Sequence, residues 1–152
     1  MADELKPVVH ALGQWAHRSV DAEVSLENLD ARLLMWNMRR KIDVLALPKG
    51  RNTVIQFTYP ELPKDQRDYW LVAKPDQSVD LCLIDPGHDV DLFIRADLKA
   101  MTSAWMGWSS LRREIDAETI VLVGSNRLIN TLEKWMVRCA YAMPEVGQAK
   151  AA

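Results

Sequence analysis

The most informative segment of the sequence is Val90–Met136, VDLFIRADLKAMTSAWMGWSSLRREIDAETIVLVGSNRLINTLEKWM. It begins with the period-two alternation of a half-buried strand and continues with apolar residues at helical spacing. Aspartate and serine residues that suit helix N-caps divide the stretch. We predict, in order, a strand over 90–95, a helix from Asp97 to Gly107, a short helix from Ser109 or Ser110 to about Ile115, a strand over Thr119–Val123, and, after Gly124, a closing helix from Ser125 to about Ala142.

Three more strands are predicted upstream, because β-branched, aromatic and alternating apolar residues gather in segments bounded by turn residues. They span residues 53–59, 69–73 and 78–84. Short turns join these segments to the strand at 90–95, and short turns favour an antiparallel meander over βαβ units. We predict an α+β fold with an antiparallel sheet of about five strands covered by helices.

Two helices are predicted before the sheet. One runs from a Ser25 cap to about Lys41. The other covers about residues 5–18, where Pro7 leaves two possibilities open: the helix begins near Lys6, or Asp3 caps it and Pro7 distorts its first turns. Its apolar stripe predicts a homodimer interface, since exposed apolar patches mark partners; the stripe consists of Leu5, Val8, Leu12 and Trp15.

The chain divides into an N-terminal helix at 1–19, a main domain at 25–142 and a tail at 143–152 that we expect to be disordered. Its 152 residues suffice for one domain with a proper core. The net charge of −2 argues against a general nucleic-acid binder. Cys82 and Cys139 form no metal-type spacing, which favours a reducing cytoplasm. Neither a signal peptide nor a membrane span is expected.

The candidate chemical sites are weak. His10 and His17 share a helix face without an evident third metal ligand. The aspartates at 85, 89 and 91 lack the ordered oxygens of a calcium loop, and Ser109 lacks the glycines of a nucleophile elbow. The turn at 123–127 has one glycine, so helix capping is favoured over anion binding. We expect no catalytic residues, no metal and no cofactor, and therefore no enzyme.

Two segments resemble the sterol carrier protein family. VDLFIRADLKAMTSAWMG is similar to that family's strand-to-helix passage, and IVLVGSNRLINTLEKWM is similar to its short strand, Gly-Asp turn and final helix. Ser125 stands where the family often has aspartate, and both residue types cap helices. The resemblance implies a sterol-carrier-like fold that holds an apolar ligand between sheet and helices.

A third segment, ELKPVVHALGQWAHRS at Glu4–Ser19, resembles the last helix of HxlR-type bacterial winged-helix regulators. Some regulators of that type carry a sterol-carrier-like domain directly after this helix. The resemblance implies the effector-binding, dimerising part of a transcriptional regulator. DNA would then be a partner only through a winged-helix domain not present in this chain.

Large, adaptable side chains on the helical segments are the candidate ligand-binding residues. They are Met35, Trp105, Trp108, Leu132 and Trp135. Two alternatives to the regulator remain open. One is a free-standing carrier of lipids or hydrophobic metabolites. The other is a structural dimerisation module in which these side chains are plain core.

Overall fold

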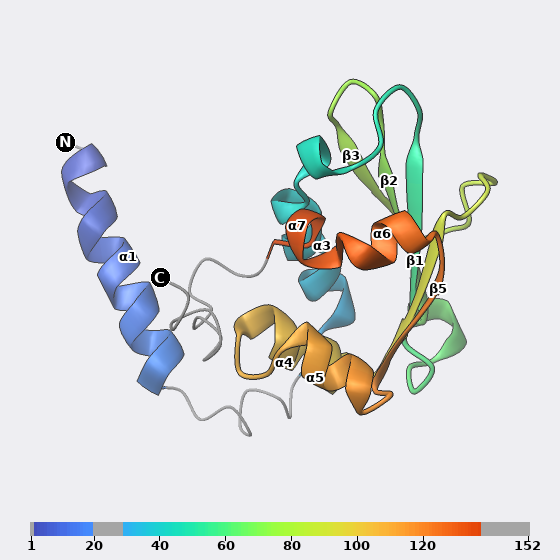
Figure 1. Ribbon diagram of the computed structural model, residues 1–152. Helices are drawn as coiled ribbons and strands as arrows, with labels where there is room; N and C mark the ends of the chain where they lie inside the picture. Colours follow the sequence, from blue (N-terminus) through green and yellow to red (C-terminus); the bar gives the residue numbers. More distant parts are fainter. Residues whose placement is uncertain (1, 20–28, 138–152) are drawn as a thin grey trace.

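The computed structural model describes residues 2–19 and 29–137, with side chains at 5–13, 15 and 29–137. Within these ranges a five-stranded sheet carries helices on one face, while helix α1 (Ala2–Ser19) stands apart (Figure 1). The predicted Ser25 cap, the Cys139 thiol, the His17 side chain and the tail at 143–152 lie outside the described residues. No helix among the described residues is long and apolar enough to cross a bilayer.

The sheet has the order β3-β2-β1-β4-β5. Its strands are β1 (Thr53–Thr58), β2 (Asp68–Ala73), β3 (Val79–Cys82), β4 (Leu92–Ala96) and β5 (Ile120–Gly124). The α+β class with five strands is confirmed. The predicted meander is wrong at one step, because β4 does not pair with β3. It pairs parallel with β1, with Ile55 opposite Leu92.

The physical reason lies in the connection between β3 and β4. Residues 83–91 cross the sheet, and Val90 packs on its outer face against Val54, Trp70 and Val72. The Asp85–His88 segment does contain a tight turn, in which the Asp85 carboxylate accepts from the Gly87 N–H at 2.8 Å. A turn bends the chain, but it does not determine which strand comes next to which.

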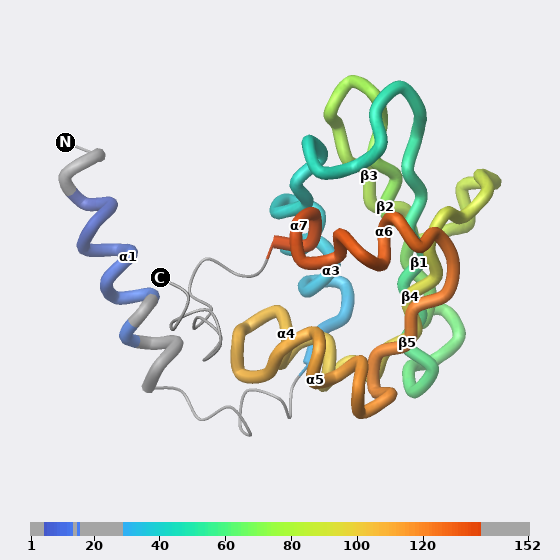
Figure 2. The backbone as a smooth tube through the Cα atoms, viewed as in Figure 1, coloured from blue at the N-terminus to red at the C-terminus, as the bar shows by residue number. Residues whose placement is uncertain are grey.

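The helices on the inner face are α3 (Ala31–Lys41), α4 (Leu98–Met106), α5 (Leu111–Asp116), α6 (Asn126–Asn130) and α7 (Leu132–Trp135), with short 3-10 turns η1 (Val44–Ala46) and η2 (Lys64–Gln66). Figure 2 shows the same arrangement as a tube. Two predicted caps are confirmed: Ser110 accepts from Arg113 N at the start of α5, and Ser125 accepts from Leu128 N at the start of α6. Gly107 ends α4 in the left-handed conformation that glycine favours.

Of the two possibilities for the first helix, the structure has the one in which Pro7 lies inside it, because α1 begins at Ala2. Two other helix boundaries differ from prediction. α3 begins at Ala31, because the Asp30 carboxylate accepts from Leu33 N at 3.2 Å and caps the helix there. The closing helix is two short pieces, broken at Thr131, whose hydroxyl donates to Arg127 O at 2.7 Å. Such side-chain to backbone bonds compete with helix geometry.

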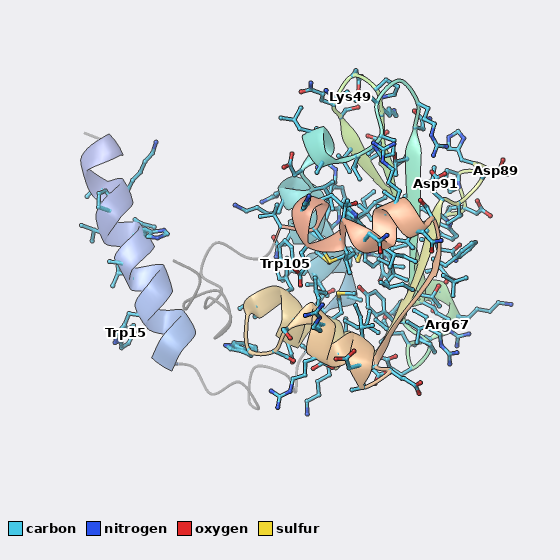
Figure 3. The ribbon with its side chains drawn as sticks, in the orientation of Figure 1. Trp15, Lys49, Arg67, Asp89, Asp91 and Trp105 are labelled. Atoms are coloured by element: carbon cyan, nitrogen blue, oxygen red, sulfur yellow. The ribbon has the colours of Figure 1, made fainter. Side chains whose placement is uncertain are left out.

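Asp91 fastens the start of β4 to its neighbours. Its backbone N–H donates to Val54 O, and its carboxylate accepts from Val54 N, both at 2.8 Å. Its carbonyl accepts from Ser125 N at 2.9 Å, and its carboxylate pairs with Arg51 at 3.2 Å. Figure 3 labels Asp91 beside β1. Asp91 is therefore a structural residue, unlike the more exposed Asp85 and Asp89 of the same loop.

Candidate functional site

The predicted ligand-binding residues come from three helices and one loop. Met35 of α3, Trp105 of α4, and Leu132 and Trp135 of α7 belong to one buried cluster with the inner face of the sheet. Figure 3 labels Trp105. Trp108 lies in the loop after α4 and is half-buried outside that cluster. The structure thus brings four of the five side chains into one layer, and a cavity among them stays a prediction.

The indole of Trp135 is already hydrogen-bonded within the chain. Its Nε1–H donates to Leu128 O at 2.9 Å, across the break between α6 and α7. This bond helps to hold α7 against the core after the helix is interrupted. A ligand oxygen would have to compete with the Leu128 carbonyl for this donor.

A buried hydroxyl that the sequence reasoning missed lies beside Met35. Tyr59, directly after β1, is fully buried, and its hydroxyl donates to the Met35 sulfur at 3.1 Å. A thioether is a weak acceptor. The Tyr69 ring lies edge-on to Tyr59, with ring centroids 6.0 Å apart. Tyr59 therefore places a poorly satisfied polar group in an otherwise apolar layer.

A second buried hydroxyl lies at the other end of the same strand. Thr53 is 1% exposed, and its Oγ1 has no hydrogen-bond partner within residues 2–19 and 29–137. Residues 53, 55, 57 and 59 alternate onto one face of β1, so the two hydroxyls are separated by roughly 20 Å of strand. The sequence contains a signal for these two hydroxyls. Thr53 and Tyr59 flank Ile55 and Phe57 at period two, so a hydroxyl-bearing residue stands at each end of a series of apolar residues on one face of the strand.

Burial raises the pKa of the Tyr59 phenol well above its ordinary value, and the nearby Tyr69 and Glu61 add to the shift. Because the folded-state pKa is raised, the contribution to stability is complete below the unfolded pKa of about 10 and is lost as pH rises above it. Relative to Tyr59→Phe, the wild-type chain should lose about 1.4 kcal/mol of unfolding free energy per pH unit in that range. Urea unfolding at several alkaline pH values measures this slope, and parallel curves for the two proteins would contradict it.

An open groove of about 930 Å³ lies elsewhere, where the end of β4 and the start of β5 meet the segment that follows β1. Ile115 of α5 and Ile129 of α6 line it together with Ile120 and Leu122 of β5. Acidic side chains, among them Glu118, and Arg95 lie at its borders. None of the five predicted ligand-binding residues lines this groove.

Among the residues that the structure describes, no group of three or more histidine, cysteine or acidic side chains could hold a metal ion. The Ser109 hydroxyl donates to the Glu114 carboxylate at 2.6 Å, which ties the α4–α5 loop to α5. The Gly124 turn serves helix capping by Ser125.

No protein-family model matches the sequence, and no curated protein matches it either. Solved structures do resemble the fold. The sterol carrier protein domain 2 of Helicoverpa armigera has a TM-score of 0.52 at 14% identity, over 76% of this chain and 88% of that one. The chain has a sterol-carrier-protein-like fold. That fold was expected from the residue patterns of Val90–Gly107 and Ile120–Met136, and it is confirmed.

The same fold lies inside a longer enzyme. A stereoselective inverting sec-alkylsulfatase from Pseudomonas sp. has a TM-score of 0.56 at 12% identity over 78% of this chain, and a double mutant of this enzyme has a TM-score of 0.58 at 11% identity. This chain spans 18% of the sulfatase chain. At these identities the likeness concerns the fold alone, so neither the sulfatase activity nor a carried ligand transfers to this chain.

Proposed function

We propose that this chain binds a small apolar ligand between its sheet and its helices, and that it forms a homodimer through α1. The observation that carries the first part is the Tyr59 hydroxyl, which is fully buried and, among the residues that the structure describes, bonded only to the Met35 sulfur. Ligand pockets are mostly apolar with a few placed polar groups, and this hydroxyl is such a group. Thr53 Oγ1, buried without a partner, supplies a second one.

The side chains and short helices of the helical layer can rearrange to admit a ligand. Met35, Met38 and Met101 are fully buried against the sheet, and unbranched thioether side chains adapt to guests of varied shape. The covering helices α6 and α7 have five and four residues. Short elements of this kind open at lower free energy than long ones, so a ligand can displace them locally. The proposed lining residues remain Met35, Trp105, Trp108, Leu132 and Trp135.

The composition of the buried layer also restricts which polar group the ligand can carry. Thr53 is the one buried polar or charged residue apart from the tyrosines, among the residues that the structure describes. A charged head group would therefore lack a buried partner of opposite sign, and an unpaired buried charge is costly. A neutral, oxygen-bearing aliphatic molecule fits the proposed site better than a carboxylate.

The proposed biological role is the effector-binding domain of a bacterial transcriptional regulator. The support is the resemblance of residues 4–19 to the last helix of HxlR-type regulators, together with the exposed stripe on α1. The ligand would act only by binding one arrangement of the helices better than another. We propose no catalytic function. A winged-helix reading frame upstream of residue 4 would favour the regulator over a free-standing carrier.

Binding should be measured with dodecanol and dodecane supplied from phosphatidylcholine vesicles, using tryptophan fluorescence and urea unfolding. Both should bind wild type, and dodecanol at about a hundred times its Kd should stabilise the fold by roughly 2.7 kcal/mol. Tyr59→Phe should weaken dodecanol about fivefold through the lost hydrogen bond and leave dodecane unchanged.

Tyr69→Phe is the matched control, because it removes a hydroxyl from the neighbouring ring without touching the Tyr59–Met35 contact. For each ligand, the ratio of the variant's Kd to the wild-type Kd does not depend on that ligand's solubility. If neither compound binds wild type, the proposed function is wrong. If Tyr59→Phe and Tyr69→Phe weaken both compounds alike, the ligand site does not use the Tyr59 hydroxyl.

A further inference from the structure

The two edges of the sheet are built differently. At the β3 edge, Arg39 of α3 donates through Nε to Val79 O at 2.6 Å, and Asp80 pairs with Lys74 at 2.6 Å. Charges and covering side chains are the usual protection of an edge strand against pairing. β5 has the sequence Ile-Val-Leu-Val-Gly, without any charge. Its outer-face side chains Val121 and Val123 are 41% and 60% exposed.

The open edge of β5 carries backbone groups directed outward. Asp97 N donates to Thr119 O, and Ser125 N donates to Asp91 O, at the two ends of the β4–β5 ladder. Hydrogen-bonded pairs alternate along an antiparallel ladder, so Val121 and Val123 bond to β4. Ile120 and Leu122 therefore direct their N–H and C=O groups away from the sheet, toward the groove described above.

The groove reaches the part of β5 that carries these free groups. Ile120 and Leu122 line it there, together with Ile115 and Ile129 of the flanking helices. A strand that bonded to the free groups of Ile120 and Leu122 would place alternate side chains against these two isoleucines. Strand addition of this kind combines main-chain hydrogen bonds with side-chain pockets.

We propose that the strand that pairs with this free edge is β5 of a second copy of the chain. The pairing is antiparallel about a two-fold axis at Leu122 and joins the two sheets into one of ten strands. An interface around a two-fold axis must be self-complementary. The outward groups meet this condition, because Ile120 and Gly124 are symmetric about Leu122.

The charges at the ends of β5 are also self-complementary. Glu118 precedes the strand and Arg127 follows it, and both side chains are exposed. Antiparallel pairing about Leu122 brings the start of one β5 beside the end of the other, so Glu118 comes to the same end of the interface as the partner's Arg127. Each dimer therefore contains two such acid–base pairs. Opposite charges arranged in this way fix the register of an interface.

The test isolates this interface by using the full chain with the α1 stripe disabled by Leu12→Asp and Trp15→Asp. Sedimentation should then still report a dimer. Adding Leu122→Pro should give monomers, with the dissociation constant raised at least about a hundredfold. The fold should survive, because proline is tolerated at an edge position whose N–H points away from the ladder. Circular dichroism checks the fold.

Charge exchange provides a second, independent measurement. Glu118→Lys alone and Arg127→Glu alone should each weaken the dimer about tenfold, because each change brings like charges together twice. The double exchange should restore the wild-type dissociation constant. Three results would each overturn the proposal. The protein could be monomeric before any β5 substitution, the dimer could persist in Leu122→Pro, or the double exchange could fail to restore pairing. If Leu122→Pro unfolds the chain, the exchange series decides alone.

Discussion

Replacing Leu12 and Trp15 of α1 by aspartate is expected to remove the α1 interface and raise its dissociation constant at least about a thousandfold. Leu5, Val8, Leu12 and Trp15 are 55–62% exposed although they share one face of the helix. Figure 3 shows Trp15 on the side of α1 that faces away from the rest of the molecule. Large apolar anchors at the centre of an interface contribute about 2 kcal/mol or more each, and two of them give the stated factor if their effects add.

The measurement is sedimentation of a chain that also carries Leu122→Pro, so that pairing through β5 does not contribute. Ile84→Asp is the matched control, since Ile84 is 83% exposed in the β3–β4 connection and has no predicted interface role. The control chain should stay dimeric while the α1 variant becomes monomeric. A dimer that survives both α1 substitutions would show that this stripe does not mediate self-association.

Gly124→Ala is expected to destabilise the fold by about 3 kcal/mol. Gly124 ends β5 with φ 138°, a conformation that residues with a side chain rarely adopt. A Cβ at this position would lie 2.5 Å from Asp91 O and 3.0 Å from Leu92 Cα. Both neighbours are backbone atoms, so no flexible side chain can move away. The Asp91 carbonyl also accepts from Ser125 N, and relief of the clash would break that contact.

Gly87→Ala separates the two contributions to this effect. Gly87 also has positive φ, at 78°, but a Cβ at this position would meet no heavy atom within 4 Å apart from its own chain neighbours. Its replacement should cost only the conformational term of about 1 kcal/mol. Urea unfolding of both variants gives the difference, which is the contribution of the close approach to Asp91 and Leu92. Equal destabilisation of the two variants would remove that explanation.

Local chemistry made most individual elements predictable. The segments rich in β-forming residues at 53–59 and 69–73 correspond closely to β1 and β2. Ser110 and Ser125 were identifiable as caps because a serine before an apolar helical pattern satisfies free N–H groups at the helix start. The break at Thr131 was not predicted, because the apolar spacing of Leu128, Leu132 and Trp135 fits one continuous helix as well as two short ones.

For the candidate site, the sequence predicted which residue types take part but not how they contact one another. Met35, Trp105, Leu132 and Trp135 could be selected as large apolar residues on helices, and all four are buried in one cluster. The Tyr59–Met35 contact joins residues 24 positions apart, and no local pattern encodes such a pairing. Likewise, an exposed and a buried tyrosine look the same in a sequence, so the poorly satisfied hydroxyl became visible only in the folded chain.

The types of the elements, the buried face of β4 and the starts of α4, α5 and α6 could be predicted from the sequence, because they depend on residues within one or two turns of each other. The tertiary structure alone decided that β4 lies parallel to β1, that Arg39 covers one edge of the sheet, and that β5 forms the other edge. The physical reason is that a period-two pattern specifies which side chains face the core but carries no information about which strand bonds to which. That choice depends on how residues 83–91 cross the sheet and on which edge the helices cover.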